Sequence, residues 1–244
     1  MPQNIYDQLA FFEEYSRMRR SVQGLSGAPE WLAMRALLPD LTGLRVLDLG
    51  CGFGWFCRWS REHGARAVTG VDISVNMLER ARTSTSDAEI TYLQADLEDL
   101  HLPAESFEVV YSSLALHYVA ALPGLLRQVH AALSPGGRFL FSVEHPIFTA
   151  ARHTDWLPDG QGGVTWPVDG YRREGPRTRS WLSQDVVKQH RTIGTYLNSL
   201  IQTGFVLQHV EEWGPTDQQV LERPELAVER ERPMFLLVAA QKRT

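Results

Sequence analysis

Cysteine is scarce in this chain, whose 244 residues hold only Cys51 and Cys57. Two cysteines in one short segment cannot form a disulfide framework, and no second pair completes a zinc site. We interpret both as free thiols in a reducing compartment. Long apolar runs are also missing: the longest, Met234 to Ala240, is far shorter than the roughly 18 residues that a membrane helix needs. Because the N-terminus is polar and acidic rather than a secretory signal, we expect a cytoplasmic protein without a membrane anchor.

Positive charge is not in excess either. The chain has 24 basic and 29 acidic residues, a net charge of −5, so no global field attracts nucleic acid or an anionic membrane. Lysine occurs only at Lys188 and Lys242, and the arginines include one cluster, Arg172, Arg173, Arg177 and Arg179. Such a cluster is typical of a solvated face, although docking of an acidic partner or recruitment to RNA stays open. We expect a small molecule as partner, and a homodimer is compatible with the sequence.

The remaining composition, 43% hydrophobic and 22% charged, is that of a globular protein. From Leu44 onward, short apolar strands alternate with helices, which is typical of a parallel sheet covered on both faces. Helices are expected at 4–20, Pro29–Leu38, 54–63, 74–83, 122–132 and about 189–203, and strands at Leu44–Leu49, Ala67–Val71, Ile90–Ala95, Phe107–Tyr111, Gly137–Val143, Phe205–Glu211 and Met234–Gln241. The last two strands are joined by too little helix for a crossover, so we expect an antiparallel pair at the sheet edge.

The predicted fold is therefore a Rossmann-like three-layer α/β sandwich with a seven-stranded, mostly parallel sheet. We expect one domain made of N-terminal cap helices (1–43), a binding core (44–145), an insertion (146–188) and a C-terminal helix with strands (189–244). The insertion is rich in glycine and proline, holds Trp156, Trp166 and Trp181, and has little periodicity. Long segments of this kind are often lids or binding loops, so we predict a lid over a substrate site.

A glycine-rich turn follows the first core strand in VLDLGCGFGWF, Val46 to Phe56. Glycine allows backbone to approach a ligand closely, and the turn lies where open α/β sheets bind cofactors. Gly50, Gly52 and Gly54 are one residue closer together than in the dinucleotide fingerprint, which argues against a pyrophosphate ligand.

Three acidic residues, Asp48, Asp72 and Asp96, end three successive strands. Asp72 can accept hydrogen bonds from both ribose hydroxyls, a role that nicotinamide enzymes also use. Asp96 is placed for the amino group of adenine. The three carboxylates together suit a cationic nucleoside without phosphates.

With these motifs, the sequence resembles the class I S-adenosylmethionine-dependent methyltransferases, specifically the type 11 small-molecule group related to quinone-biosynthesis methyltransferases. The resemblance covers about 44–145 and includes the glycine motif, the two later aspartates, YSSLALHYV and LSPGGRF. It implies S-adenosyl-L-methionine as cofactor, with Asp48 and Gly50–Gly54 at its methionine part, Asp72 at ribose, and Asp96 with Leu97 at adenine. Cys51 is interpreted as a small filler. The further implied cofactor contacts are Tyr15, Arg20, Ile73, Met77 and Ser112.

The acceptor side is predicted from the residues beyond the fourth and fifth strands. His117 and His145 are both candidate general bases, because imidazole titrates near neutral pH; a packing role is the alternative for each. Neither a motif for nucleobase amines nor an acidic cluster for magnesium follows these strands. We therefore predict metal-independent methyl transfer to an oxygen or nitrogen of a small metabolite. The candidate substrate contacts are Glu144, Trp156, His190 and Arg191, the last two expected at a helix start that Thr192 caps.

Other functions stay open at this point. An NAD(P)-dependent oxidoreductase is favoured by the glycine turn and Asp72, but opposed by the glycine spacing and the absence of a Tyr-x-x-x-Lys pair. A C-methyltransferase of a quinone-like ring and a non-catalytic binding module are the remaining alternatives.

Overall fold

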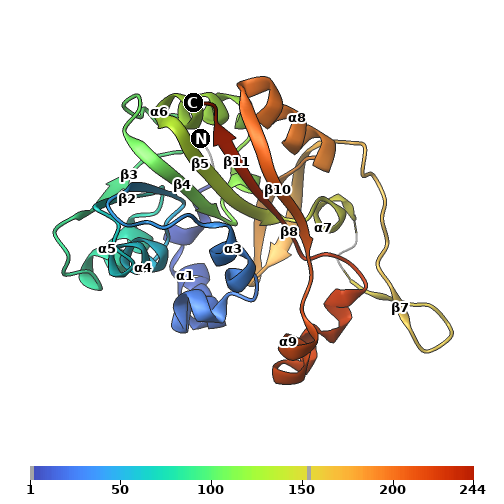
Figure 1. The fold of residues 1–244 in the computed structure, drawn as a ribbon. Helices are drawn as coiled ribbons and strands as arrows, with labels where there is room; N and C mark the ends of the chain where they lie inside the picture. The colour runs from blue at the N-terminus through green and yellow to red at the C-terminus, as the bar shows by residue number, and fades with distance from the viewer. Residues whose placement is uncertain (1–2, 153–154) are drawn as a thin grey trace.

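The computed structural model describes residues 3–152 and 155–244. Its main sheet has seven strands in the order β10-β11-β5-β4-β1-β2-β3 (Figure 1). These strands are β1 (Arg45–Leu49), β2 (Ala67–Asp72), β3 (Ile90–Gln94), β4 (Phe107–Ser113), β5 (Leu133–Glu144), β10 (Phe205–Trp213) and β11 (Phe235–Lys242). The first five are parallel, β11 is antiparallel to β5, and β10 is antiparallel to β11. The predicted seven-stranded sheet with an antiparallel C-terminal edge is confirmed.

Two hydrophobic cores cover the two faces of this sheet. Helices α6 (Leu122–Ala132) and α8 (Ile193–Thr203) lie above it in Figure 1 and pack on Phe139 and Phe141 of β5. On the other face, residues of α3 (Trp31–Leu37), α4 (Trp55–Glu62) and α5 (Val75–Thr83) share a core with Leu140. The alternation of Phe139, Leu140 and Phe141 between the cores follows from the two-residue period of a strand.

The N-terminal segment forms several short helices instead of the single predicted helix at 4–20. These are η1 (Ile5–Asp7), α1 (Leu9–Arg17), α2 (Arg19–Val22) and η2 (Gly24–Gly27). The break between α1 and α2 falls at Met18, whose backbone is extended. After this break comes α2, whose Arg20 lines the same cavity as the glycine loop.

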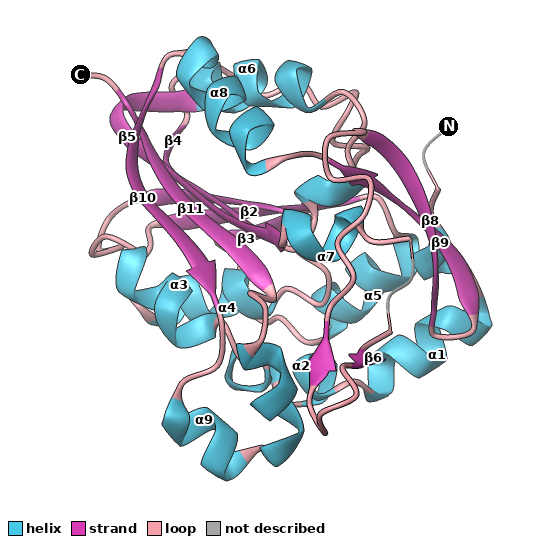
Figure 2. Ribbon diagram, turned by 90° about the vertical axis from the view of Figure 1, so that its right-hand side faces the viewer, coloured by secondary structure: helices cyan, strands magenta, loops and turns pink. Residues whose placement is uncertain are grey.

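The insertion is more regular than predicted. After α7 (Pro146–Ala150) come the short pair β6 (Leu157–Pro158) and β7 (Val164–Thr165), and then a hairpin of β8 (Gly175–Trp181) and β9 (Gln184–His190). Figure 2 shows this hairpin beside α1, where Trp181 meets Phe11 at a ring-centroid distance of 5.4 Å. The helix predicted from about 189 begins only at Ile193, with the predicted Thr192 cap accepting a hydrogen bond from the Thr195 N–H.

The connection between β10 and β11 forms α9 (Asp217–Glu222) and η4 (Pro224–Arg230), which lie below the sheet in Figure 1.

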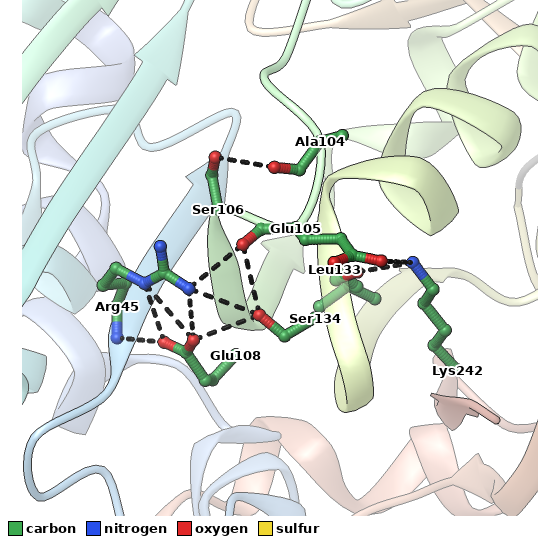
Figure 3. Close-up of polar contacts among 8 residues, drawn as sticks. All are labelled: Arg45, Ala104, Glu105, Ser106, Glu108, Leu133, Ser134 and Lys242. Atoms are coloured by element: carbon green, nitrogen blue, oxygen red, sulfur yellow. Dashed lines mark hydrogen bonds and ion pairs between the residues drawn. The ribbon is translucent and has the colours of Figure 1, made fainter. Parts of the chain in front are cut away.

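A polar network ties the strands together at the edge where β1 begins (Figure 3). Arg45 of β1 donates to Glu108 of β4 through its backbone N–H, at 2.8 Å, and through its guanidinium, at 2.5 Å. The Ser134 hydroxyl of β5 donates to the same carboxylate at 3.1 Å, and the Lys242 ammonium of β11 donates to the Leu133 carbonyl at 2.7 Å. Four strands are thereby joined at the edge opposite the glycine loop.

Candidate active site

The glycine loop between β1 and α4 is held close to its neighbours. Gly50, Gly52 and Gly54 all have positive φ angles, of 77°, 51° and 70°. A Cβ at Gly50 would overlap Ala115, whereas the space beside Gly52 is open. The loop needs glycine because L-residues with side chains rarely adopt this backbone conformation.

Asp72 at the end of β2 fixes the position of this loop. Its Oδ2 accepts a hydrogen bond from the Gly52 N–H at 2.8 Å, and its Oδ1 accepts one from the Ser74 N–H at 2.9 Å. Burial raises the pKa of Asp72, and these N–H donors offset part of that effect. The sequence predicted a ligand contact here but not the bond to the loop itself.

Asp48 lies deeper, beneath the loop. It accepts a hydrogen bond from the Cys57 thiol at 3.4 Å, and burial raises the pKa of this carboxyl to about 7. Burial also raises the pKa of the Cys51 and Cys57 thiols, which are therefore protonated and unreactive near neutral pH.

A cavity of about 1300 Å³ opens above the carboxyl ends of the strands. Its lining includes nine of the predicted cofactor contacts: Tyr15, Arg20, Gly50, Gly52, Asp72, Ile73, Met77, Asp96 and Leu97. Asp48 and Cys51 line a recess of about 100 Å³ that shares Tyr15 and Arg20 with the cavity. We call the region at Gly50, Asp72 and Asp96 the β1–β3 part of the cavity.

Ser112 is the predicted cofactor contact that lies elsewhere. Its hydroxyl donates to the Leu49 carbonyl at 2.8 Å, and the side chain is fully buried between strands. The next residue, Ser113, lines the cavity instead, because successive side chains of a strand point to opposite faces.

The N-terminal helices contribute one wall. Tyr15 comes from α1 and Arg20 from α2, whose guanidinium donates to both oxygens of Glu30 at 3.0 and 3.1 Å. The two side chains come from either side of the break at Met18 and line the same cavity.

The other side of the cavity, which we call the β5–β11 part, lies where these two strands meet. Glu144 ends β5 and is the register partner of Phe235 on β11. The residues that line this part are His117, Tyr118, Glu144, Phe148, Trp181, Glu229, Arg232, Met234 and Phe235.

His117 lines this part in the neutral form. It is 2% exposed, and burial lowers its pKa to about 3. Its Nδ1 accepts a hydrogen bond from the Glu144 backbone N–H at 3.3 Å, so the ring proton is assigned to Nε2. In this state the ring is a hydrogen-bond donor toward a ligand and a poor proton acceptor, which argues against the predicted role of general base.

Glu144 forms a buried ion pair with Lys188 of β9 at 2.5 Å. Burial raises the pKa of Glu144, but the Lys188 ammonium, together with smaller contributions from its other neighbours, holds the pKa below its usual value. Lys188 is 5% exposed, and its Nζ lies 4.9 Å from the ring centroid of Trp181. Lys188 was not among the predicted site residues. The one sequence feature that could have pointed to it is the rarity of lysine in an arginine-rich chain.

The geometry does not support His145 as a general base. Its Nδ1 accepts a hydrogen bond from the Ile147 N–H at 3.1 Å and its Nε2 contacts Glu212 at 2.9 Å. Both ring nitrogens are therefore used in capping α7 and joining β5 to β10, and His145 is not among the lining residues.

Three predicted substrate contacts also lie away from the cavity lining. His190 ends β9 instead of opening a helix and contacts the Thr149 hydroxyl at 2.8 Å. Arg191 donates to the carbonyls of Val119 and Ala120 at 2.5 and 2.9 Å. Trp156 packs edge-on against Trp166 at a centroid distance of 5.1 Å. All three hold the insertion and its neighbouring loops in place.

Within the described ranges, no three His, Cys, Asp or Glu side chains gather in a way that suits a metal ion. In the same part of the chain, no helix is long and apolar enough to cross a membrane.

The chain is similar to known proteins in sequence and in fold. Residues 47–141 match the family model of a methyltransferase domain. The crystal structure of an S-adenosylmethionine-dependent methyltransferase from Mesorhizobium loti is 59% identical, with a TM-score of 0.87, over 90% of this chain and 100% of that chain.

Two named enzymes are similar over shorter stretches. Malonyl-(acyl-carrier protein) O-methyltransferase of Pectobacterium atrosepticum is 40% identical over 44% of this chain, and phosphoethanolamine N-methyltransferase 1 of Arabidopsis thaliana is 30% identical over 70%. The matches span only 42% and 34% of those two proteins.

The match to the Mesorhizobium structure combines high identity with coverage of most of both chains. The cofactor is accordingly S-adenosyl-L-methionine, and the nicotinamide alternative is set aside. This chain belongs to the S-adenosylmethionine-dependent methyltransferases.

Proposed function

We propose that this methyltransferase transfers the methyl group to an oxygen or nitrogen of a small-molecule acceptor, without a metal ion. The observation that carries the proposal is the extent of the cavity, which runs from the glycine loop to Glu144 and Arg232. Its volume of about 1300 Å³ exceeds the roughly 300–1,000 Å³ of ordinary single-ligand pockets. A second small molecule therefore has room beside the cofactor.

In this proposal the β1–β3 part holds the cofactor. Asp72 accepts the ribose hydroxyls, Asp96 and Leu97 contact the adenine, and the open space beside Gly52 lets the ligand reach the backbone. Tyr15 and Arg20 lie along the methionine part, because they line both the cavity and the recess at Asp48. The fit rests on the open space beside Gly52 and on the carboxylates of Asp72 and Asp96 in the cavity lining.

The β5–β11 part holds the acceptor. When bound, the cofactor supplies a methyl group on a sulfonium, whose bond to sulfur breaks with the electron pair remaining on sulfur. The protein then has to align the nucleophile and let its proton leave. His117 donates a hydrogen bond from Nε2, and the ionised carboxylate of Glu144 accepts the N–H or O–H of the acceptor. Glu144, rather than either histidine, is the group suited to orient the acceptor, because its carboxylate stays ionised and accepts a hydrogen bond; the proton of the acceptor passes to solvent.

The two named relatives support the choice of atoms, since their names state methylation of an oxygen and of a nitrogen. Methylation of a ring carbon in a quinone-like acceptor is the alternative, because Tyr118, Phe148 and Trp181 give this part of the cavity aromatic walls.

The proposal is tested by incubating the full chain with methyl-labelled S-adenosylmethionine and a panel of amines, carboxylic acids, phenols and hydroxyquinones. Mass spectrometry then locates the label. Transfer to nitrogen or oxygen is the expected result, and it should disappear in Asp72→Ala. Label found only on a ring carbon would establish the alternative, and a panel without any labelled product would contradict a small-molecule acceptor.

A further inference from the structure

The β5–β11 part of the cavity contains two buried ion pairs. Glu144 lines the cavity and pairs with Lys188, which is not among the lining residues, at 2.5 Å. Arg232 and Glu229 both line the cavity and pair with each other at 2.9 Å. Glu144 and Arg232 are close along the fold, because Phe235, three residues after Arg232, is the register partner of Glu144. A guanidinium and two carboxylates therefore line the same edge of the sheet.

Arg232 has rings around it but few hydrogen-bond acceptors. Its guanidinium carbon lies 4.0 Å from the ring centroid of Trp166, 4.7 Å from that of Phe148 and 5.2 Å from that of Trp156. The residue is 6% exposed, and its Nε has no hydrogen-bond partner. The rings hold the planar group in place but cannot accept its N–H bonds. A carboxylate or a phosphate is the ligand whose oxygens match a guanidinium in this way.

Glu144, in contrast, lacks a hydrogen-bond donor. Its Oε1 is taken by Lys188, while Oε2 is buried and without a partner. An ionised carboxylate only accepts hydrogen bonds, so the missing partner must be an N–H or O–H group. Leaving such buried atoms unpaired is unfavourable, which makes both of them expected points of ligand contact.

The charges of the two pairs cancel, so this part of the cavity does not select a ligand with a net charge of either sign. We propose that the acceptor is a small zwitterion, with an amine on Glu144 and a carboxylate or phosphate on Arg232. This inference rests on the proposed function, because it assumes that the β5–β11 part takes the acceptor. It adds the chemical class of that acceptor and the residue that recognises its anionic group.

The test is calorimetric titration of the full chain saturated with S-adenosylhomocysteine. The probes are amino carboxylates and amino phosphates of increasing chain length, each beside its N-acetyl derivative and a neutral analogue in which an alcohol replaces the anion. At least one zwitterion should bind about tenfold or more tightly than both of its analogues. Comparison of the carboxylate and phosphate series identifies the anion that Arg232 prefers.

Variants locate the two contacts. Arg232→Met and Glu144→Gln should each weaken zwitterion binding by about tenfold or more, and Arg232→Lys should weaken it less because the charge is kept. Arg177→Met is the matched control, since Arg177 is partly buried, lies outside the cavity lining and donates to backbone carbonyls. Unchanged affinity for S-adenosylhomocysteine in each variant shows that the fold is intact.

The inference is overturned if the neutral or acetylated analogues bind as tightly as the zwitterions, or if no zwitterion binds the loaded protein. A methylated product from a singly charged or neutral acceptor would also overturn it while leaving the proposed function standing. Binding of zwitterions without any methyl transfer would have the opposite effect, supporting the recognition and contradicting the function.

Discussion

The two parts of the cavity are built in different ways. The β1–β3 part comes largely from one stretch of chain, 48–97, and contacts its ligand through glycine backbone and strand-end carboxylates. The β5–β11 part combines side chains from β5, the insertion, the hairpin and the β10–β11 connection. In the proposed function, one contiguous stretch binds the cofactor, whereas segments far apart in the chain bind the acceptor. If the two parts are independent, a substitution in one should leave the ligand affinity of the other unchanged.

The largest effect is expected for Asp72→Ala. The change removes a proposed ribose contact and also leaves the Gly52 and Ser74 N–H groups without their acceptor, so affinity for S-adenosylhomocysteine should fall by about 100-fold or more. Calorimetry measures the effect. Asp87→Ala is the control, because Asp87 pairs with Arg61 outside the cavity. Equal affinity in Asp72→Ala and the unmodified protein would refute the cofactor assignment.

Glu144→Gln should separate the two parts. We expect turnover with an accepted substrate to fall by about 10- to 100-fold, because the neutral amide no longer orients the N–H or O–H of the acceptor as the ionised carboxylate does, while affinity for S-adenosylhomocysteine stays the same. Steady-state kinetics beside calorimetry show both effects. Glu212→Gln is the matched variant: its carboxylate contacts His145 rather than the cavity and should leave turnover unchanged. A parallel loss of cofactor affinity in Glu144→Gln would show that the two parts are not independent.

We expect His117 to affect the pH dependence of the free energy of unfolding rather than to act as a base. Burial lowers its pKa to about 3, so below the unfolded-state value of about 6.5 the unfolded chain binds a proton that the native protein does not. Stability from this group is complete above that value and is lost as the pH falls toward 3, by about 1.4 kcal/mol per pH unit.

Urea unfolding at several pH values between 5 and 7 measures this slope. His117→Gln should flatten it, and the more exposed His101→Gln serves as control. An unchanged slope in His117→Gln would mean that the ring is protonated in the native protein.

The smallest effect is expected at the opposite edge of the sheet. Glu108→Gln weakens the partly exposed network with Arg45 and Ser134 and should lower the free energy of unfolding by about 1 kcal/mol. Cofactor affinity and turnover should not change, since these residues are remote from the cavity lining. A change in either would show that the strand ends at the cavity respond to packing at the far edge.

The sequence predicted the sheet and the β1–β3 part because their signals are local. Strand, glycine turn and helix follow one another within a few residues, and Asp48, Asp72 and Asp96 stand at strand ends that periodicity reveals. Ser112 was predicted to point toward the cofactor, but Ser113 lines the cavity instead. A shift of one residue in a strand is enough to exchange the two faces.

The hairpin β8–β9 was missed for a physical reason. Its two-residue turn, Leu182 and Ser183, has positive φ at both positions, 49° and 58°, without the asparagine or glycine that signals such turns. The inward positions of β9 include Lys188 and His190, so the alternation of apolar residues is broken. The roles of His145, His190, Arg191 and Lys188 depend on partners far away in the chain, which no local pattern reveals.

Asp48 gives the protein a link between cofactor binding and the acidity of the medium. A carboxyl whose pKa is about 7 is roughly half protonated at neutral pH, so a ligand that binds only its ionised form releases about half a proton. The enthalpy of binding would then differ between buffers with different ionisation enthalpies. In the proposed function, in which Asp48 lies at the methionine part of the cofactor, this one buried side chain would couple cofactor capture to proton release.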